Sequence, residues 1–317
     1  MLLDLDGSPN PKSASAMHGI LEGQDRSPYS VQQYFLETTR HQVRFDFDLF
    51  GPYSVDAAWC GHGSIVDAGT IALAQNATGL RLYDAMIYVT EEAPDRGCRY
   101  QGGTYQGGYR AETNTIVLFG HQQPALIVHE LGHALGLRHA FGLRCEGSSV
   151  VVANCGSKEY ADPTDVMGHP HMSKLYYNFN APHKIAMGTT PPDEIKPIRK
   201  SGTYTIIGSE TDRDGTHILS IKASGDVFGA NAHFFIEYRQ PLAAFAKSMR
   251  SEFVVTAWTE NIYDPTYYIA SLHCRRTACD SLVLTQGAQT IRITALSEGT
   301  GKGKVSIDFS DSTTIAG

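Results

Sequence analysis

Eleven consecutive residues, 129 to 139, contain the side chains needed for a zinc site with its own general base. They read His-Glu-Leu-Gly-His-Ala-Leu-Gly-Leu-Arg-His. On a helix, His129 and His133 lie four residues apart, so their imidazoles project from the same face and can bind one ion. Glu130 lies beside the pair, where its carboxylate can take a proton from a water that the ion activates. The pattern therefore predicts zinc-assisted hydrolysis.

The end of the motif supplies a turn and a third ligand. Gly136 can adopt the left-handed conformation that ends a helix at little steric cost, and His139 then returns toward the ion. Three protein ligands leave the fourth position to water, as in a catalytic zinc site, whereas a structural zinc has four protein ligands. The alternative is a set of ordinary histidines on a buried helix face. Chance produces the full motif in only roughly one in ten thousand chains of this composition, which argues against that alternative.

A helix and a small sheet are expected to position these residues. The zinc-binding helix should begin at Pro124, which is tolerated in a first turn, and run to about Gly136. Upstream, the expected elements are helices at 30–40 and 64–76 and strands at 43–49, 85–90 and 114–119. The first 28 residues are rich in Ser, Pro, Gly and Asp, and we expect little structure in them, as in a tail or the stub of a propeptide.

Two domains are expected, because 317 residues is long for one hydrophobic core. Residues 189–193, Thr-Thr-Pro-Pro-Asp, have the composition of a linker. Beyond them, short strands without intervening helices predict an antiparallel β-sandwich. These strands are expected at 202–207, 217–222, 233–238, 253–258, 267–273, 281–284, 290–295 and 304–309. The predicted organisation is α+β, with a tail at 1–28, a catalytic domain at 29–190 and the β-sandwich at 191–317.

Together these residues resemble a metzincin metallopeptidase. The zinc motif is followed by Asp165-Val166-Met167-Gly168, which is similar to the Met-turn of that clan. The resemblance implies that Met167 forms a hydrophobic floor beneath the zinc-binding histidines. Residues 160–168, 180–184 and 34–37 are more specifically similar to the gametolysin-like peptidases and their bacterial relatives. The resemblance implies a mixed-sheet catalytic domain with an active-site helix, in a secreted zinc endopeptidase that cleaves extracellular proteins or glycoproteins.

One position departs from that pattern. Several metzincin families have a tyrosine two residues after the Met-turn methionine, where it assists the zinc or the oxyanion, but here that position is His169. His169 is therefore our candidate for this second catalytic role, with His171, Tyr176 and Tyr177 as the other candidates near it in sequence. For each of them, a loop residue without a chemical role is the alternative.

Six cysteines favour an oxidising, extracellular setting over free thiols. Cys145 with Cys155 and Cys274 with Cys279 would close short loops, which leaves Cys60 to pair with Cys98. A zinc site made of thiolates has little support, because no Cys-x-x-Cys is present. The first ten residues lack the cationic start and apolar core of a signal peptide, so secretion would require a removed leader or another route.

Charge and hydropathy limit the partners. The net charge of -7 and the absence of a basic run argue against nucleic acid, and no stretch approaches the ~20 apolar residues of a membrane span. A protein or peptide substrate is expected. The β-sandwich could also carry an exosite for a glycan or protein. Residues 210–215 resemble the start of a calcium loop, but Ile221 occupies its twelfth position, so an ordinary turn is favoured. Ca²⁺ could stabilise the fold at a site that the sequence does not assign.

Two other classes of function stay open on the sequence alone. A zinc hydrolase acting on a non-peptide substrate would have the same ligands, although the Met-turn resemblance favours a peptidase. A glycan-binding or protein-binding protein with a vestigial catalytic half would need no intact motif. The presence of all five motif residues disfavours that last reading.

Overall fold

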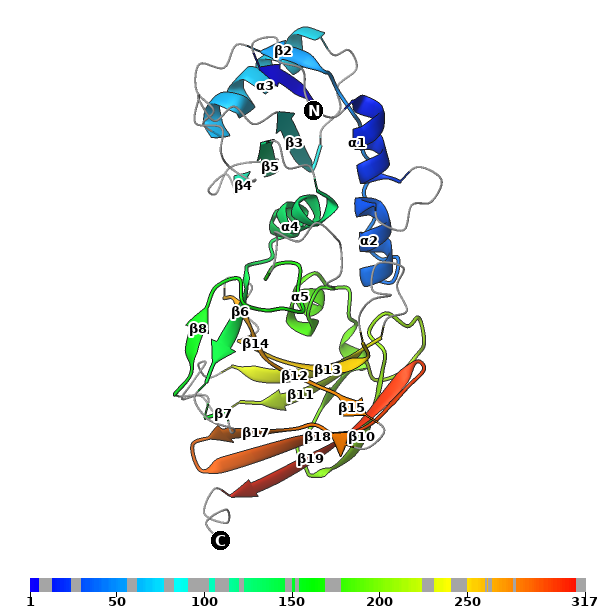
Figure 1. Ribbon diagram of the computed structural model, residues 1–317, viewed down its shortest axis with the longest axis vertical. Helices are drawn as coiled ribbons and strands as arrows, with labels where there is room; N and C mark the ends of the chain where they lie inside the picture. Colours follow the sequence, from blue (N-terminus) through cyan, green and yellow to red (C-terminus); the bar gives the residue numbers. More distant parts are fainter. Residues whose placement is uncertain are drawn as a thin grey trace. The chain divides into compact units, whose positions relative to one another are not determined.

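The computed structural model describes residues 1–5, 13–23, 30–55, 62–76, 83–90, 103–105, 114–119, 123–145, 150–151, 154–168, 178–223, 231–240, 250–259, 261, 264–275 and 278–311. Both helices and sheets are present, so the α+β class is confirmed (Figure 1). The chain forms two compact units. The first contains residues 1–34 and 44–135, and the second contains residues 35–43, 136–170 and 176–317.

The elements before residue 135 are helices and short strands. They are β1 (Leu3–Leu5), α1 (Ala14–Leu21), α2 (Val31–Thr38), β2 (Tyr53–Val55), α3 (His62–Asn76), β3 (Ala85–Thr90), β4 (Gly103–Tyr105), β5 (Asn114–Phe119) and α4 (Pro124–Ala134). In a mixed sheet, β5 lies between β3 and β4, parallel to β3 and antiparallel to β4. The helices predicted at 30–40 and 64–76 and the strands predicted at 85–90 and 114–119 are confirmed. The Ser30 side chain caps α2 by accepting a hydrogen bond from Gln33 N at 3.1 Å.

The expectation of little structure in the first 28 residues is wrong. Strand β1 pairs in parallel with β2, and the side chains of Leu2, Leu3 and Met17 are almost completely buried. The terminal amine of Met1 donates to Ile87 O at 2.6 Å. Its surroundings are apolar, and burial lowers the pKa of this amine to about 5. The prediction rested on the many Ser, Pro and Gly residues of this segment. It gave too little weight to the few apolar side chains, which pack into the core of the first unit.

The strand predicted at 43–49 is also absent, although the pattern behind the prediction is real. Burial alternates as expected, with Phe45 and Phe47 half-buried and Asp46 exposed. The rings of Phe45 and Phe47 stack with their centroids 5.8 Å apart. Among the described residues, no strand pairs with residues 43–49, so no ladder forms there. A half-buried extended segment therefore gives the same period of two as a strand does.

Beyond residue 136 the chain is mainly β-structure. The elements are β6 (Ala140–Arg144), β7 (Val150–Val151), β8 (Gly156–Lys158), α5 (Ala181–Ala186), the 3₁₀ helix η3 (Pro192–Glu194), β9 (Ile195–Pro197), β10 (Gly202–Ile207), β11 (Ile218–Lys222), β12 (His233–Arg239), β13 (Glu252–Trp258), β14 (Thr266–Leu272), β15 (Cys274–Arg275), β16 (Ala278–Cys279), β17 (Ser281–Gln286), β18 (Gln289–Gly299) and β19 (Lys302–Asp311). All the strands predicted from 202 to 309 are present, and their ends agree within a few residues.

Two sheets of the second unit share one core. One sheet has the order β8-β6-β14-β13-β12-β11-β9, and the other has the order β10-β19-β18-β17-β7. The two sheets lie face to face in Figure 1, and apolar side chains of both sheets meet in a single cluster. Strands β6, β7 and β8 precede residue 191 in sequence, yet they extend these two sheets by pairing with β14, β17 and each other.

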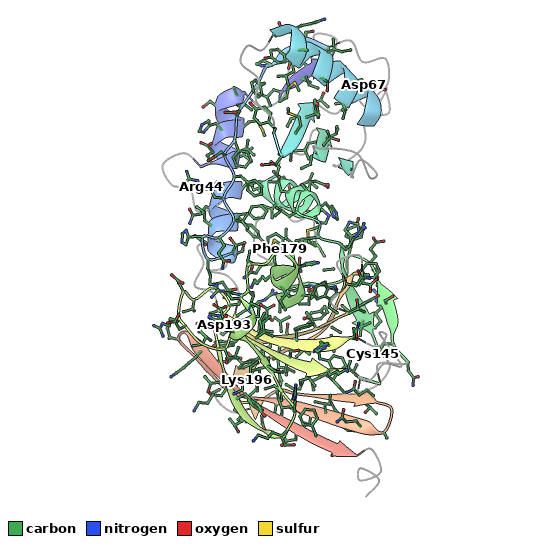
Figure 2. All side chains as sticks on the ribbon, turned by 180° about the vertical axis from the view of Figure 1, so that it is seen from behind. Arg44, Asp67, Cys145, Phe179, Asp193 and Lys196 are labelled. Carbon is green, nitrogen blue, oxygen red and sulfur yellow. A yellow bond between two sulfur atoms is a disulfide. The ribbon has the colours of Figure 1, made fainter. Side chains whose placement is uncertain are left out.

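Helix α5 covers the other face of the seven-stranded sheet. Every residue of β13 is buried, which requires cover on both faces of the sheet. Ala181 of α5 packs against Ile218, Phe235 and Trp258, and these form a second apolar cluster. Nearby, the ring of Phe179, labelled in Figure 2, lies 5.6 Å from that of Phe35. The segment that leads into α5 is therefore held firmly. No helix in the described part of the chain is long and apolar enough to cross a membrane.

Candidate metal centre

Helix α4 carries the first two histidines of the motif and begins where Pro124 predicts. Pro124 is in the first turn, and residues 125–132 are all buried. The amide of Leu135 bonds to the carbonyls of Leu131 and Gly132 at 2.9 and 3.1 Å, so the last turn tightens before the helix ends. Gly136 has a φ of +88°, and an added Cβ would meet nothing within 4 Å. Glycine is thus favoured here by its positive φ and not by a lack of room for a side chain. It ends the helix, as the sequence predicts.

The four-residue spacing places the two imidazoles of α4 side by side. The ring centroids of His129 and His133 lie 4.8 Å apart with the ring planes at 90°. His129 is 3% exposed and Glu130 is 5% exposed. Glu130 follows His129 directly on α4, and its burial shields the carboxylate from bulk solvent.

The third histidine meets the other two. One ligand atom from each of His129, His133 and His139 lies within 4.8 Å of the others, and no other such group of histidine, cysteine and acidic side chains occurs in the described residues. Three imidazole nitrogens are ligands that suit zinc. Two zinc-bound nitrogens lie about 3.3 Å apart in tetrahedral geometry, so small side-chain movements suffice to bring the donors together. The residues therefore fit a single metal ion.

Two residues to which the sequence assigned no role contact His139. Glu159 Oε1 lies 2.5 Å from Nδ1, and Tyr160 Oη lies 2.8 Å from Nε2. The Tyr160 and His139 rings also contact each other, with centroids 4.1 Å apart. Glu159 and Tyr160 follow His139 by 20 and 21 residues, a separation without a periodic signal. Only the fold brings them to the imidazole.

Met167 lies in a segment fixed by a buried carboxylate. Asp165 Oδ1 accepts from Met167 N at 2.6 Å, and Oδ2 accepts from Asn180 N at 2.6 Å. The same Oδ2 lies 2.8 Å from His183 Nδ1. Met167 is fully buried. Residues 165–168 and 180–184, which the family resemblance singled out separately, are thus joined through Asp165.

A second aspartate supports the same segment. Asp162 Oδ1 accepts from Thr164 N and Thr164 Oγ1 at 2.8 and 2.7 Å, and Oδ2 accepts from Asn180 Nδ2 at 3.2 Å. Burial and the neighbouring charge of Asp165 raise the pKa of Asp162 to about 6. At Asp165, burial acts in the same direction, but His183 and the two backbone amides outweigh it and lower the pKa. Only glycine fits at position 168, because a Cβ there would clash with the backbone carbonyl of Asp162.

An ion-pair network ties this region to the seven-stranded sheet. Glu237 Oε1 accepts from Arg239 Nη2 at 2.6 Å and from Ala181 N at 2.9 Å, and Oε2 accepts from Lys184 Nζ at 3.2 Å. All three charged side chains are at most 5% exposed. Burial would raise the pKa of Glu237, but Arg239 and Lys184 outweigh it and lower the pKa. Arg239 also donates to Thr164 O and Phe179 O.

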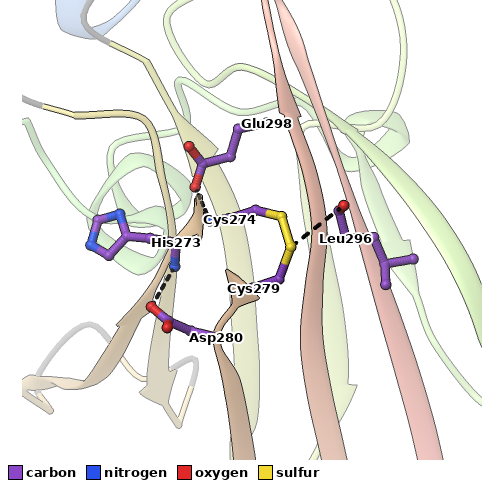
Figure 3. Close-up of a disulfide and its surroundings, with 6 residues drawn as sticks. All are labelled: His273, Cys274, Cys279, Asp280, Leu296 and Glu298. Carbon is purple, nitrogen blue, oxygen red and sulfur yellow. Dashed lines mark hydrogen bonds between the residues drawn. A yellow bond between two sulfur atoms is a disulfide. The ribbon is translucent and has the colours of Figure 1, made fainter. Parts of the chain in front are cut away.

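The other sequence predictions have mixed outcomes. The candidate electrophiles His169, His171, Tyr176 and Tyr177 lie outside the described residues, and so do Cys60 and Cys98. The predicted disulfides Cys145–Cys155 and Cys274–Cys279 are present. The latter joins β15 to β16, where Glu298 accepts from Cys274 N at 2.5 Å and Asp280 accepts from His273 N at 3.0 Å (Figure 3).

The calcium-like sequence at 210–215 has the features of a turn. Glu210 Oε1 accepts from Asn178 Nδ2 at 2.5 Å and from Ser209 Oγ at 3.0 Å. Glu210, the first acidic residue of this segment, therefore hydrogen-bonds to protein groups. Among the described residues, no cluster of three or more histidine, cysteine and acidic side chains occurs besides the three histidines, so Ca²⁺ stays unassigned.

No model of a known protein family matches the sequence, and no curated protein matches it.

Proposed function

We propose that this protein is a secreted zinc-dependent endopeptidase of the metzincin type, which hydrolyses peptide bonds of extracellular proteins or glycoproteins. The observation that carries the proposal is the convergence of His129, His133 and His139. The buried Glu130, next to His129 in sequence, is the candidate base. The position of Gly136 and the fixed segment around Met167 support the metzincin assignment. In this proposal, α4 and the mixed sheet belong to the catalytic part, and the two facing sheets form a β-sandwich.

Each residue has a distinct role in this proposal. The three histidines would hold the ion as neutral imidazoles, and zinc bound in this way lowers the pKa of a water to near ~7 and polarises a carbonyl. Glu130 would act as the general base toward the attacking water and then as the general acid that returns the proton to the leaving nitrogen, so no covalent intermediate with the protein is needed. Met167 and Asp165 support the site without contacting the reacting atoms.

The deciding experiment compares the wild type with Glu130→Gln at equal zinc occupancy. Each protein is incubated with a mixed library of peptides, and the cleaved bonds are identified by mass spectrometry. We expect cleavage by the wild type, and a rate lower by roughly 10²–10⁴-fold for Glu130→Gln, because general acid–base catalysis contributes about that factor. Glu22→Gln, an exposed change directly after α1, is the matched control and should cleave as the wild type does.

The outcomes separate the competing classes of function. Substantial turnover by Glu130→Gln would contradict the assignment of the base. Stoichiometric zinc without cleavage by either protein would favour a hydrolase of a non-peptide substrate. Failure to bind any metal would favour a binding protein with a vestigial catalytic half. The two disulfides of the described residues support an extracellular location, which detection of the protein outside its cells would test.

A further inference from the structure

The side chains of Glu159 and Tyr160 occupy opposite sides of one imidazole. Glu159 Oε1 lies 2.5 Å from His139 Nδ1, and Tyr160 Oη lies 2.8 Å from Nε2. We propose that Tyr160 is a fourth protein ligand of the metal ion and that Glu159 is the positioning residue that aims Nε2 of His139 at that ion. This inference rests on the proposed zinc site, and it names a residue that neither the motif nor the resemblance assigns.

Glu159 determines which nitrogen of His139 can bind a metal. A carboxylate accepts only, so the nitrogen that faces Glu159 must carry the proton. Nε2 is then the unprotonated nitrogen, whose electron pair accepts from the Tyr160 hydroxyl here and would bind the ion in the loaded site. Partners of this kind fix the orientation of a metal-binding imidazole and raise its basicity, and their loss commonly weakens metal binding 10–100-fold. Because Glu159 is half exposed, a part of this effect is screened by solvent.

The hydroxyl of Tyr160 is at the distance expected between two ligands of one ion. Bonds to zinc are about 2.0–2.1 Å long, so ligand atoms at right angles around it lie about 2.9 Å apart. Tyr160 Oη and His139 Nε2 are 2.8 Å apart. An ion held by Nε2 would therefore have the phenol oxygen within bonding reach after little movement. Catalytic zinc accepts a fifth ligand, so Tyr160 does not prevent water from binding.

The backbone of Tyr160 is in an unusual conformation that serves this placement. Its φ is +57°, in the left-handed region that bulky residues rarely adopt. Such conformations persist where the surroundings impose them, and they gather at functional sites. Tyr160 is also 40% exposed, so apolar burial does not explain its presence there. Its ring instead packs on the imidazole of His139.

The test uses copper as a spectroscopic probe in the full-length protein. Ligation of Cu²⁺ by a phenol oxygen produces a charge-transfer absorption in the visible range, which imidazole ligands alone do not produce. We expect this band in the wild type loaded with one equivalent of Cu²⁺. It should disappear in Tyr160→Phe and persist in Tyr204→Phe. Tyr204 is the matched control, because its hydroxyl donates to Lys200 O, away from the three histidines.

A second readout measures zinc affinity by competition with a chromophoric chelator. Glu159→Gln should bind zinc 10–100-fold more weakly than the wild type and keep the copper band. Tyr160→Phe should also bind zinc more weakly. Tyr160→Gly relieves the backbone conformation at this position while removing the phenol. If Tyr160→Phe folds poorly, Tyr160→Gly must still lose the band, while thermal unfolding of the metal-free protein confirms that it is folded.

The possible results distinguish this inference from the proposed function. A wild type that binds one Cu²⁺ without the band, or a band that persists in Tyr160→Phe, overturns the role of Tyr160 and leaves the zinc site intact. Unchanged zinc affinity in Glu159→Gln overturns the role of Glu159. A wild type that binds neither Cu²⁺ nor Zn²⁺ overturns both the inference and the proposed function.

Discussion

Replacing Glu237 by Gln should strongly destabilise the second unit. Glu237 is fully buried and neutralises Lys184 and Arg239, which are themselves at most 5% exposed. The substitution keeps the shape of the side chain and an acceptor for Ala181 N, but it leaves the two cations without their shared carboxylate. Removing one partner of a buried pair costs about 3–5 kcal/mol, because the remaining charge is buried and uncompensated.

The remaining network suggests the lower half of that range. Arg239 keeps its hydrogen bonds to Thr164 O and Phe179 O. Lys184 is slightly more exposed than Arg239, but within the described part of the chain Glu237 is its one ion-pair partner. We therefore expect a loss of about 3–4 kcal/mol, most of it from Lys184. In that case Lys184→Met should cost less in the Glu237→Gln background than in the wild type, by about 1–3 kcal/mol in a double-mutant cycle.

The assay is equilibrium unfolding in urea, followed by the fluorescence of Trp258. This indole is buried beside Phe235 and donates to Asn261 O, so it reports on the seven-stranded sheet. All proteins carry Trp59→Phe, which leaves Trp258 as the single tryptophan. Asp308→Asn, an exposed change on β19, is the control and should stay within about 0.5 kcal/mol of the parent. A shift in Glu237→Gln no larger than that of the control would refute the argument from buried charge.

Three further predictions concern the aspartate network, the metal ligands and a disulfide. The pKa of Asp162 is raised from 3.8 to about 6, so its ionisation disfavours the folded state, and that cost grows as the pH rises from 3.8 to 6. The stability deficit of Asp162→Asn should therefore shrink by about 1 kcal/mol between pH 5 and pH 7.5, and a constant deficit would contradict the pKa. Zinc at 1,000 times its dissociation constant should stabilise the wild type and Glu130→Gln by about 4 kcal/mol in thermal unfolding. The same zinc should leave His133→Ala nearly unchanged, and equal shifts in all three proteins would contradict the assignment of His133 as a ligand. Cys145 and Cys155 are 10 residues apart in sequence, so their joint replacement by Ser should cost about 2–3 kcal/mol in urea unfolding, whereas a loss below about 1 kcal/mol would show that the loop is constrained by other contacts.

The sequence predicted well those features that depend on neighbours in the chain. The spacing of His129 and His133, the end of α4 near Gly136 and the strands from β10 onward all follow from local periodicity and turn residues. The same reasoning failed at residues 43–49. Alternating burial there was read correctly, but a strand also needs a partner, and the pattern of a single segment does not reveal one.

Features that depend on distant contacts could not be predicted. Nothing local marks Leu3 as a member of a parallel strand pair with Tyr53, since a three-residue segment has too little periodicity. Strand β6 joins β14 in parallel across more than 120 residues. Glu159 and Tyr160 likewise reach His139 only because β6 and β8 pair antiparallel and place residues 142–144 beside 156–158. The partners of a predicted ligand are thus set by tertiary structure even where the ligand itself is set by a local motif.

In the second unit, a buried network of hydrogen bonds and ion pairs connects the seven-stranded sheet to the segment around Met167. Glu237 on β12 holds α5 through Ala181 N and Lys184. The residue before α5, Asn180, then donates its amide to Asp165, whose other oxygen accepts from Met167 N. The groups that make these contacts are buried, and an unsatisfied polar group there would be costly. The network therefore favours a single arrangement of these side chains. The methionine is therefore positioned by strands far from it in sequence, which argues that the β-structure supports the proposed catalytic site as well as offering a surface for binding.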